Sequence, residues 1–470
     1  MSTTVAQLLA DPSTLRNWSH EELFAVPREE VEAAQLTALK ERYEQMRSAI
    51  RLVDRLASDI EVDRIDRLDD VTPLCLPHTT YKSYSAAHIE DGRYERMNRW
   101  LSGLTAHDLS GVDVNGVDSL EGWLTALDEQ TPLRLLTSSG TSGKMSFFPR
   151  SRPEEGAMMG WHFMQHSGYR DEADSRLISG EVDYYTLWPV ATGHHNMPTL
   201  FRLLREIVFA GQEDRLHTLG KGHWDADLIW LSGRLKAAEA RGELAQLELT
   251  PKMKDLQARL SEQQQDVDDD VDRFMDEVLV GTAGKRIFFL CQYPLLIPFA
   301  QRARERGLTA QFSADSYVLA GQKSGTKGTI YPDGWYELCK SIVPHEHQAV
   351  YGMTELTGSA RMCAAGNFHS PPWIIQFLLD PDTSEPLPRE GVQTGRFAAF
   401  DLWPRTYWGG TISGDQLTID WRGGCECGRT APVIGPEIGR YANLRDDDKI
   451  TCSKSPDAYA KAVELTLSIE

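Results

Sequence analysis

Apolar and polar positions follow different periods along the chain, and these periods predict where helices and strands form. Residues 26–59 carry apolar residues at helical spacing among many charged ones, which predicts an amphipathic helix. The same spacing predicts a second long helical region over residues 224–279. Short apolar runs between these regions predict buried strands at residues 133–137, 184–188, 286–290, 311–313, 316–320 and 349–351.

Strands and helices alternate over the middle of the chain, an order that is typical of an α/β protein with a parallel or mixed sheet. Helical spacing fades over residues 374–434, where segments such as 395–402 and 417–421 alternate and indicate a β-rich subdomain. Residues 256–275 are rich in Gln, Asp and Glu. A metal-binding acidic cluster is one interpretation of this run, but the pattern favours the solvated face of a surface helix.

Composition and charge limit the classes of protein that fit. A chain of 470 residues with 41% hydrophobic content can bury one large core or two to three smaller ones. Its formal net charge of −20 argues against a nucleic-acid partner, because phosphate neutralisation needs clustered Lys and Arg. The sequence has neither a secretory signal pattern nor an apolar run long enough for a membrane span, and its 7 cysteines do not suggest a disulfide framework. We therefore expect a cytoplasmic protein without a membrane partner.

A loop of small hydroxyl residues and glycines follows the predicted strand at 133–137 and carries the first candidate chemistry. Small residues let backbone amides approach phosphate oxygens closely, and a lysine at the end of the loop adds positive charge. The spacing differs from that of the P-loop of common NTPases. Taken alone, such a loop is as typical of an ordinary turn as of a phosphate-binding site. Its members are Ser138, Ser139, Gly140, Thr141, Ser142, Gly143 and Lys144.

A second motif, Tyr-Gly-Met-Thr-Glu at residues 351–355, follows another predicted strand. An acidic residue at a strand end is well placed to hold Mg²⁺ against phosphates. Together and in this order, the two motifs resemble those of the acyl-adenylate-forming superfamily of acyl-CoA ligases, peptide-synthetase adenylation domains and luciferases. The resemblance implies that the first loop binds the β- and γ-phosphates of ATP. It also implies catalytic roles for Lys144 and Glu355, Mg²⁺ binding by Glu355, and nucleotide contacts by Tyr351, Gly352 and Thr354.

Later landmarks extend the resemblance. Asp415, in a Ser-Gly-Asp element, matches the carboxylate that binds the ribose hydroxyls, and a carboxylate is a strong acceptor for a sugar diol. Arg429 and Arg440 both follow a glycine and resemble the arginine that contacts ribose or phosphate. Gly321 stands where the superfamily places an adenine-binding strand end. The resemblance implies that these residues complete the nucleotide site.

The stretch CECGRTAPVIGPEIGR at residues 425–440 is closest to the phenylacetate-CoA ligase branch, although Asp446-Asp447 follows later than in that branch. Residues 319–325 also resemble the acyl-protein synthetase branch. The implied fold is α/β, the large N-terminal unit of adenylate-forming enzymes, with two α/β sheet subdomains and a β-rich subdomain. The expected domains are 1–130, a helical and mixed region packing on the core; 131–440, the AMP-binding adenylation core; and 441–470, a short tail in place of the mobile C-terminal cap.

The superfamily's cap supplies a catalytic lysine, and the expected short tail has to replace it or do without it. Lys449 and Lys454 are candidates for that role. Cys452 is a candidate acyl acceptor, because an ionised thiol attacks an acyl-adenylate readily; an incidental tail cysteine is the simpler interpretation. His194 and His195 lie where the superfamily places a residue of the acid pocket, and an ordinary loop role is equally open.

Three cysteines and a histidine near the candidate site form a set that could bind zinc. Cys363 and His369 follow Glu355, and Cys425 and Cys427 form a Cys-x-Cys pair. Three thiolates and one imidazole satisfy tetrahedral zinc, and such a metal would clamp loops. Ordinary reduced cysteines are the alternative.

These features together predict an ATP- and Mg²⁺-dependent ligase. It would activate a small carboxylic acid to an acyl-adenylate, release pyrophosphate, and transfer the acyl group to a thiol (CoA, a carrier protein or a cysteine) or to an amine. Catalysis would rest on positioning and charge neutralisation. The alternatives are a non-catalytic nucleotide- or acyl-binding protein that lost the cap, and a metal-stabilised interaction protein. The pattern does not separate aryl, fatty and amino acids.

Overall fold

A computed structural model describes residues 3–138, 144–167, 182–188, 192–220, 222–240, 242–244, 250–263, 267–321 and 331–444. The chain divides into two compact units, each of which is discontinuous in sequence. Unit 1 comprises Met1–Leu136, Ser146–Met164 and Gly352–Glu470, and unit 2 comprises Thr137–Met145 and Gln165–Tyr351.

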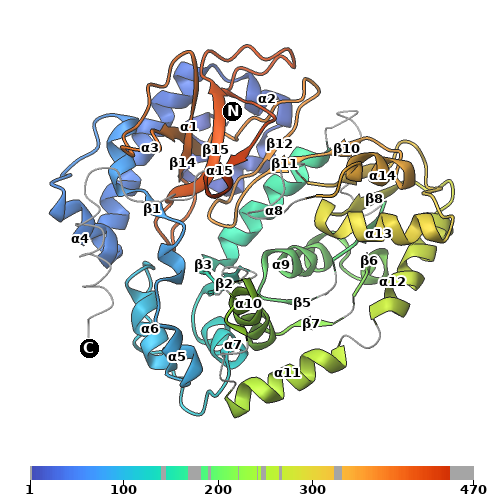
Figure 1. The fold of residues 1–470 in the computed structure, drawn as a ribbon. Helices are drawn as coiled ribbons and strands as arrows, with labels where there is room; N and C mark the ends of the chain where they lie inside the picture. Colours follow the sequence, from blue (N-terminus) through green and yellow to red (C-terminus); the bar gives the residue numbers. More distant parts are fainter. Residues whose placement is uncertain are drawn as a thin grey trace. The chain divides into compact units, whose positions relative to one another are not determined.

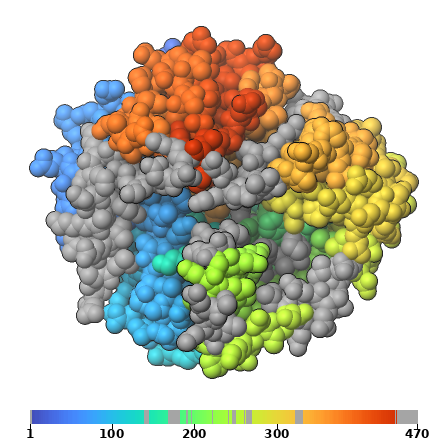
Figure 2. Space-filling model, in the orientation of Figure 1, coloured from blue at the N-terminus to red at the C-terminus, as the bar shows by residue number. Residues whose placement is uncertain are grey.

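Unit 1 is built on a largely antiparallel sheet in the order β1-β15-β14-β13, with β16 and β17 also paired to β15. Strand β15 alternates buried and partly exposed residues over its second half, the pattern of a sheet with one solvated face, whereas β14 is buried from Gly395 to Asp401. The predicted β-rich segment is thus confirmed, and Figure 2 shows its orange and red side chains gathered in one continuous block. The strands are β1 (Leu76–Pro77), β13 (Ile374–Leu379), β14 (Val392–Asp401), β15 (Gly410–Asp420), β16 (Val433–Ile434) and β17 (Gly439–Arg440).

The N-terminal helices pack on this sheet, and Figure 1 shows α1, α2 and α3 in blue beside β14 and β15. The Trp403 indole donates to the carbonyl of Leu8, and the Gln35 amide donates to the carbonyl of Pro372. The predicted helix over residues 26–59 is confirmed, with a break at Ile50, whose backbone is extended. The helices are α1 (Val5–Ala10), α2 (His20–Ala25), α3 (Arg28–Ala49), α4 (Arg51–Asp59), α5 (Ala86–Glu90), α6 (Tyr94–Ser102), α7 (Leu120–Gln130), α8 (Arg152–Ser167) and α15 (Tyr441–Leu444).

Unit 2 is built on a parallel sheet in the order β10-β9-β8-β4-β6. Its central strands β8 and β9 are continuous, buried apolar or aromatic runs, as expected when helices cover both faces of a parallel sheet. Val318, Phe289 and Tyr185 point to one face and join a core with α12 (Val267–Asp276), α13 (Tyr293–Glu305) and α14 (Trp335–Ile342). The strands are β4 (Asp183–Thr186), β6 (Leu216–Thr218), β8 (Ile287–Leu290), β9 (Tyr317–Leu319) and β10 (His347–Gln348). Two short strands, β5 (Thr192–Gly193) and β7 (His223–Trp224), pair separately.

A strand is present in each of the other predicted strand segments, but the prediction of a strand at 311–313 is wrong. There the amide of Gln311 donates to the carbonyl of Leu279, and the amide of Ser313 donates to that of Lys285. These backbone groups bond to the end of a helix and a turn, so they form no ladder, and Phe312 alone is buried. The confirmed strands outside the two main sheets are β2 (Leu133–Thr137) and β11 (Val350–Tyr351), and β3 (Phe147–Ser151) pairs with β2.

The long helical region predicted over 224–279 is interrupted. In its place lie α10 (Ala226–Ala240), α11 (Pro251–Gln263), α12 (Val267–Asp276) and a short π-helical turn (Glu277–Gly281). The described part of the acidic run falls on α11 and α12, where Asp269 is exposed and the partly exposed Asp272 carboxylate pairs with Arg302 and Arg306, as the favoured interpretation of a solvated helix face predicts. The other helices of unit 2 are α9 (Asn196–Leu203), α13 (Tyr293–Glu305) and α14 (Trp335–Ile342).

Candidate functional site

Residues 352–355 of the second motif lie in unit 1, where buried side chains hold the backbone around Glu355. Arg150, fully buried in β3, donates from Nη2 to the carbonyl oxygens of Thr354 at 2.6 Å and Leu356 at 2.9 Å. The Tyr407 hydroxyl donates to the carbonyl of Glu355 at 2.9 Å. These bonds use the backbone on each side of Glu355, so the segment is fixed independently of its carboxylate.

Asp401 anchors the residue that follows this segment. Its Oδ2 accepts hydrogen bonds from the amide and the hydroxyl of Thr357, at 2.5 and 2.7 Å. Asp401 is fully buried at the end of β14, and burial raises the pKa of its carboxyl to about 6. A buried carboxyl with these donors is a positioning group for the motif.

Glu355, Asp415 and Arg440 lie close enough in unit 1 for their charges to interact. Asp415 on β15 lies opposite Arg440 on β17, and the guanidinium pairs with the buried carboxylate. Burial raises the pKa of Glu355, and the Asp415 charge raises it further while Arg150 and Arg440 oppose the shift. Two neighbouring carboxylates beside a guanidinium suit a cation and the polar groups of a nucleotide.

Close packing explains the glycine in this motif. A Cβ added to Gly352 would lie 2.9 Å from the Cβ of Ser359, closer than side chains pack. A larger residue at 352 would therefore displace the backbone that leads into Glu355.

The structure separates the two candidate arginines. Arg440 lies with Asp415, whereas the guanidinium of Arg429 lies 4.7 Å from the centre of the Phe24 ring. Burial is the main cause that lowers the pKa of Arg429, and the neighbouring Arg361 lowers it further. Of the two, only Arg440 is placed with the predicted ribose carboxylate.

Unit 2 carries the other predicted nucleotide residues. Lys144 is half-buried, and burial lowers the pKa of its ammonium. Gly321 follows β9 with φ of +74°, a conformation that favours glycine at this strand end. Tyr351 is buried at the end of β11, and Ser138 follows β2. The predicted loop residues Ser139, Gly140, Thr141, Ser142 and Gly143 lie outside the described residues, as do Asp446, Asp447, Lys449, Cys452 and Lys454.

The histidine pair predicted near the acid pocket also lies in unit 2. The amide of Thr137 donates to the carbonyl of His194 at 2.8 Å, which ties this segment to the end of β2. His195 accepts from the amide of Met197 and so caps α9, and its ring stacks on Trp188 at 5.6 Å. Burial lowers the pKa of His195 to about 4. His195 therefore has a structural role here, as a neutral helix cap.

The four predicted zinc ligands lie together in unit 1. One potential ligand atom from each of Cys363, His369, Cys425 and Cys427 lies within 4.8 Å of all the others. The Sγ atoms of Cys363 and Cys425 are 3.8 Å apart, and Cys427 Sγ is 3.4 Å from His369 Nε2. This donor set and spacing could hold one tetrahedral metal ion.

Sequence reasoning missed the groups that hold the motif. The only signals in the sequence are that Arg150 lies inside the run FFPRS and that Asp401 follows the apolar run FAAF. A charged residue within a buried strand signals a specific partner, because an unpaired buried charge is costly. The partner Thr354 lies 204 residues from Arg150 and the partner Thr357 lies 44 residues from Asp401, so the local sequence pattern does not identify them.

Comparison with known proteins identifies the fold. No protein-family model and no curated protein matches the sequence. The chain is similar to the solved structure of 2-hydroxyisobutyryl-CoA ligase in an open conformation with 2-HIB-AMP and CoA. The TM-score is 0.52 at 13% identity, over 92% of this chain and 78% of that chain. The postadenylation structure of that ligase with R3-HIB-AMP gives a TM-score of 0.52 at 13% identity, over 90% and 70% of the two chains.

The predicted fold class is thereby confirmed: the chain has the α/β fold of adenylate-forming enzymes. At this level of identity the similarity establishes the fold alone. Among the residues described above, no helix is long and apolar enough to cross a membrane.

Proposed function

We propose that this protein is an ATP-dependent acid ligase that forms an acyl-adenylate. The observation that carries the proposal is the placement of Asp415 and Arg440 near Glu355, whose backbone is fixed by buried side chains. These are three of the residues that the motifs assigned to the nucleotide. The fold supports the proposal because the similar ligase was solved with an acyl-AMP.

The roles follow from residue chemistry. Glu355 would bind the Mg²⁺ that accompanies ATP, since hard cations prefer carboxylate oxygens. Asp415 would accept from the ribose hydroxyls, and Arg440 would hold Asp415 and contact ribose or phosphate. In unit 2, the loop from Ser138 to Lys144 would bind the β- and γ-phosphates, and Gly321 and Tyr351 would contact the nucleoside.

The proposed reaction is an in-line displacement at phosphorus. A carboxylate oxygen of the acid would attack the α-phosphate of ATP, the bond from that phosphorus to the bridging oxygen would break, and pyrophosphate would leave. The positive charges of Lys144 and Arg440 would offset charge on the phosphates, while the fixed backbone holds Glu355 in place. Positioning and preorganised charge supply most of the acceleration in such reactions.

For the second half-reaction we propose transfer to a thiol, with CoA as the first acceptor to test. The similar ligase was solved with CoA as well as an acyl-AMP. On the stretch at residues 425–440 we propose the phenylacetate-CoA ligase and acyl-protein synthetase-like branch. The expected domain bounds, the short tail in place of a cap and the cytoplasmic location stay predictions.

ATP–pyrophosphate exchange, measured across a panel of aryl, fatty, hydroxy and amino acids, tests the adenylation step. We expect one acid class to stimulate exchange, and Glu355→Gln to lower the rate by about 10²- to 10³-fold, as loss of a group that stabilises transition-state charge does. Glu95→Gln is the matched control, because Glu95 is an exposed residue of α6. Exchange that no acid stimulates, with ATP still bound, would instead support a non-catalytic nucleotide-binding protein.

A further inference from the structure

We propose that Cys363, His369, Cys425 and Cys427 bind one structural zinc ion that clamps the N-terminal helix α2 to the β-rich part of unit 1. The proposal is independent of the ligase function proposed above, because it rests on a different set of residues. The four ligand atoms come from two segments far apart in sequence, yet all lie within 4.8 Å of one another.

The spacing of the ligand atoms fits a tetrahedral ion. With Zn–S of about 2.3 Å and Zn–N of about 2.0–2.1 Å, tetrahedral ligand atoms lie about 3.6–3.8 Å apart. The observed separation of Cys363 Sγ from Cys425 Sγ is 3.8 Å, and that of Cys427 Sγ from His369 Nε2 is 3.4 Å. The longer separations in the set need only small side-chain shifts to close around an ion.

Tight turns present the sulfur atoms on both segments. The amide of Gly366 donates to the carbonyl of Cys363, and the amide of Gly428 donates to the carbonyl of Cys425. Both glycines have positive φ, at +77° and +85°, which such turns require.

The surroundings of the set favour ligands over ordinary core cysteines. The Asn367 amide Nδ2 donates to Cys425 Sγ at 3.6 Å, an interaction that stabilises a thiolate and orients a metal ligand. Cys363 and His369 are buried, so an ion here would be largely shielded from water. Three thiolates and an imidazole complete the coordination, so the ion leaves no open position for catalysis.

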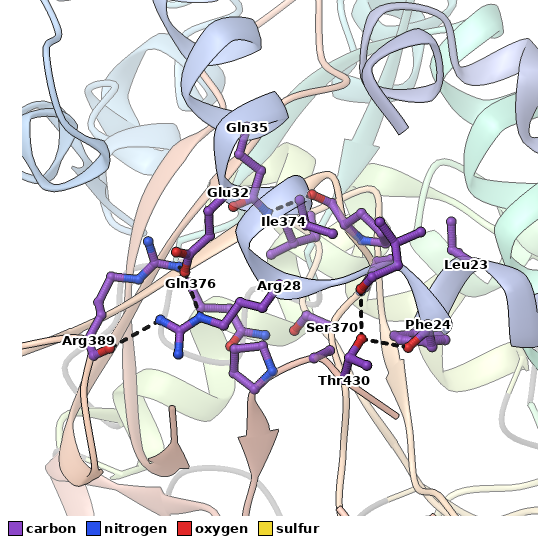
Figure 3. Close-up of a pocket in the computed structure, with 16 residues that line it drawn as sticks. Leu23, Phe24, Arg28, Glu32, Gln35, Ser370, Ile374, Gln376, Arg389 and Thr430 are labelled. Carbon is purple, nitrogen blue, oxygen red and sulfur yellow. Dashed lines mark hydrogen bonds and ion pairs between the residues drawn. The ribbon is translucent and has the colours of Figure 1, made fainter. Parts of the chain in front are cut away.

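The clamp reaches α2 through the residues that follow the Cys-x-Cys pair. The Thr430 amide donates to the carbonyl of Phe24 at 3.1 Å, its hydroxyl lies within hydrogen-bond distance of the carbonyl oxygens of Phe24 at 2.9 Å and Val26 at 2.7 Å, and Figure 3 shows Thr430 beside Phe24. The Phe24 ring also meets the His369 ring, with centres 6.2 Å apart. A metal that joins residues 363–369 to 425–427 therefore also fixes the end of α2.

Metal analysis of the full-length protein, purified without chelator, tests the inference first. We expect about one zinc per chain, and cobalt(II) introduced in its place should give the d–d absorption of a tetrahedral site with thiolate charge-transfer bands. Cys427→Ser should abolish stoichiometric zinc and change the cobalt spectrum, whereas Cys339→Ala should change neither. Cys339 is the matched control because it is buried in the core of unit 2.

Hydrogen exchange tests the clamp and does not depend on any variant folding. Removing the metal should raise exchange about tenfold or more in residues 363–369, 422–432 and 20–26, and leave the sheet of unit 2 unchanged. Absence of stoichiometric metal from the wild-type protein would overturn the site, and so would a Cys363–Cys425 disulfide found by thiol counting. Zinc that is present and lost without any change in exchange at residues 20–26 would overturn the clamp.

Discussion

The two units differ in the kinds of side chain that they bury. In unit 1, charged side chains are buried with partners: Arg150 bonds to two backbone carbonyls, and Asp401 accepts from Thr357. In unit 2, the centre of the sheet is aromatic. Phe288 stacks between Tyr184 and Tyr317, with ring centres 4.2 and 5.0 Å apart.

This difference predicts which substitutions affect the candidate site. Buried hydrogen bonds are directional, and those of unit 1 converge on the backbone next to Glu355. Ring stacking is less directional and mainly supplies stability. Changes in the polar network of unit 1 should therefore alter both function and stability, whereas changes in the aromatic centre of unit 2 should alter stability alone.

The largest effect on stability is expected in the aromatic centre of unit 2. Phe288→Ala removes a fully buried ring from β8 and should lower the free energy of unfolding by about 3–5 kcal/mol. Urea unfolding measures this loss, and we expect the KM for ATP of the folded variant to stay unchanged. A large rise in the KM for ATP with little loss of stability would contradict the expectation that the aromatic centre of unit 2 affects stability alone.

A pH effect is expected from Asp401 in unit 1. Its folded pKa of about 6 exceeds the unfolded value, so the protonated form stabilises the fold. This contribution is present below about pH 4 and is lost as the pH rises through 6, a change of about 3 kcal/mol. The difference in unfolding free energy between wild type and Asp401→Asn should fall by that amount over this range. A difference in unfolding free energy that does not change with pH would contradict the effect of burial on the pKa of Asp401.

Removing the carboxylate of Asp415 sharpens the comparison within unit 1. Asp415→Asn should raise the KM for ATP about 10- to 100-fold, because a charge-assisted hydrogen bond contributes about 1.5–3 kcal/mol. It should also lower the pKa of Glu355 by removing a neighbouring negative charge. The pH profile of ATP–pyrophosphate exchange measures the change in the pKa of Glu355. Asp59→Asn is the control, because Asp59 is an exposed residue of α4.

The smallest effect is expected for Tyr407→Phe, which removes only the hydroxyl that donates to the carbonyl of Glu355. The stability loss should be about 0.5–1.5 kcal/mol, the usual net contribution of one hydrogen bond. Because the Glu355 backbone loses a restraint, the rate of ATP–pyrophosphate exchange by Tyr407→Phe should fall below that of the wild type. This fall should be larger than the fall for Phe288→Ala, when Phe288→Ala is measured well below its melting temperature. An unaltered rate would show that this bond does not position Glu355.

Local patterns predicted much of this fold. Apolar runs predicted β2, β4, β8 and β9 closely because buried strands have a short, continuous apolar signature. The error at residues 311–313 arose because one buried residue, Phe312, between polar neighbours does not make a strand.

The site was predictable only where a residue's chemistry is written in a short motif. Glu355 and Asp415 carry such motifs, and the structure brings them near each other in unit 1. Neither the choice between Arg429 and Arg440 nor the role of Arg150 could be read from the sequence. Both depend on pairings between distant segments, such as β15 with β17.

Isotope transfer tests the proposed adenylation most directly. The acid selected by the exchange panel is prepared with ¹⁸O in both carboxylate oxygens and incubated with ATP, Mg²⁺, CoA and the protein. If the carboxylate attacks the α-phosphate and the acyl carbon–oxygen bond breaks in the transfer to CoA, one ¹⁸O appears in AMP. Label in inorganic phosphate released with ADP, or a thioester formed with no label in AMP, would contradict adenylation.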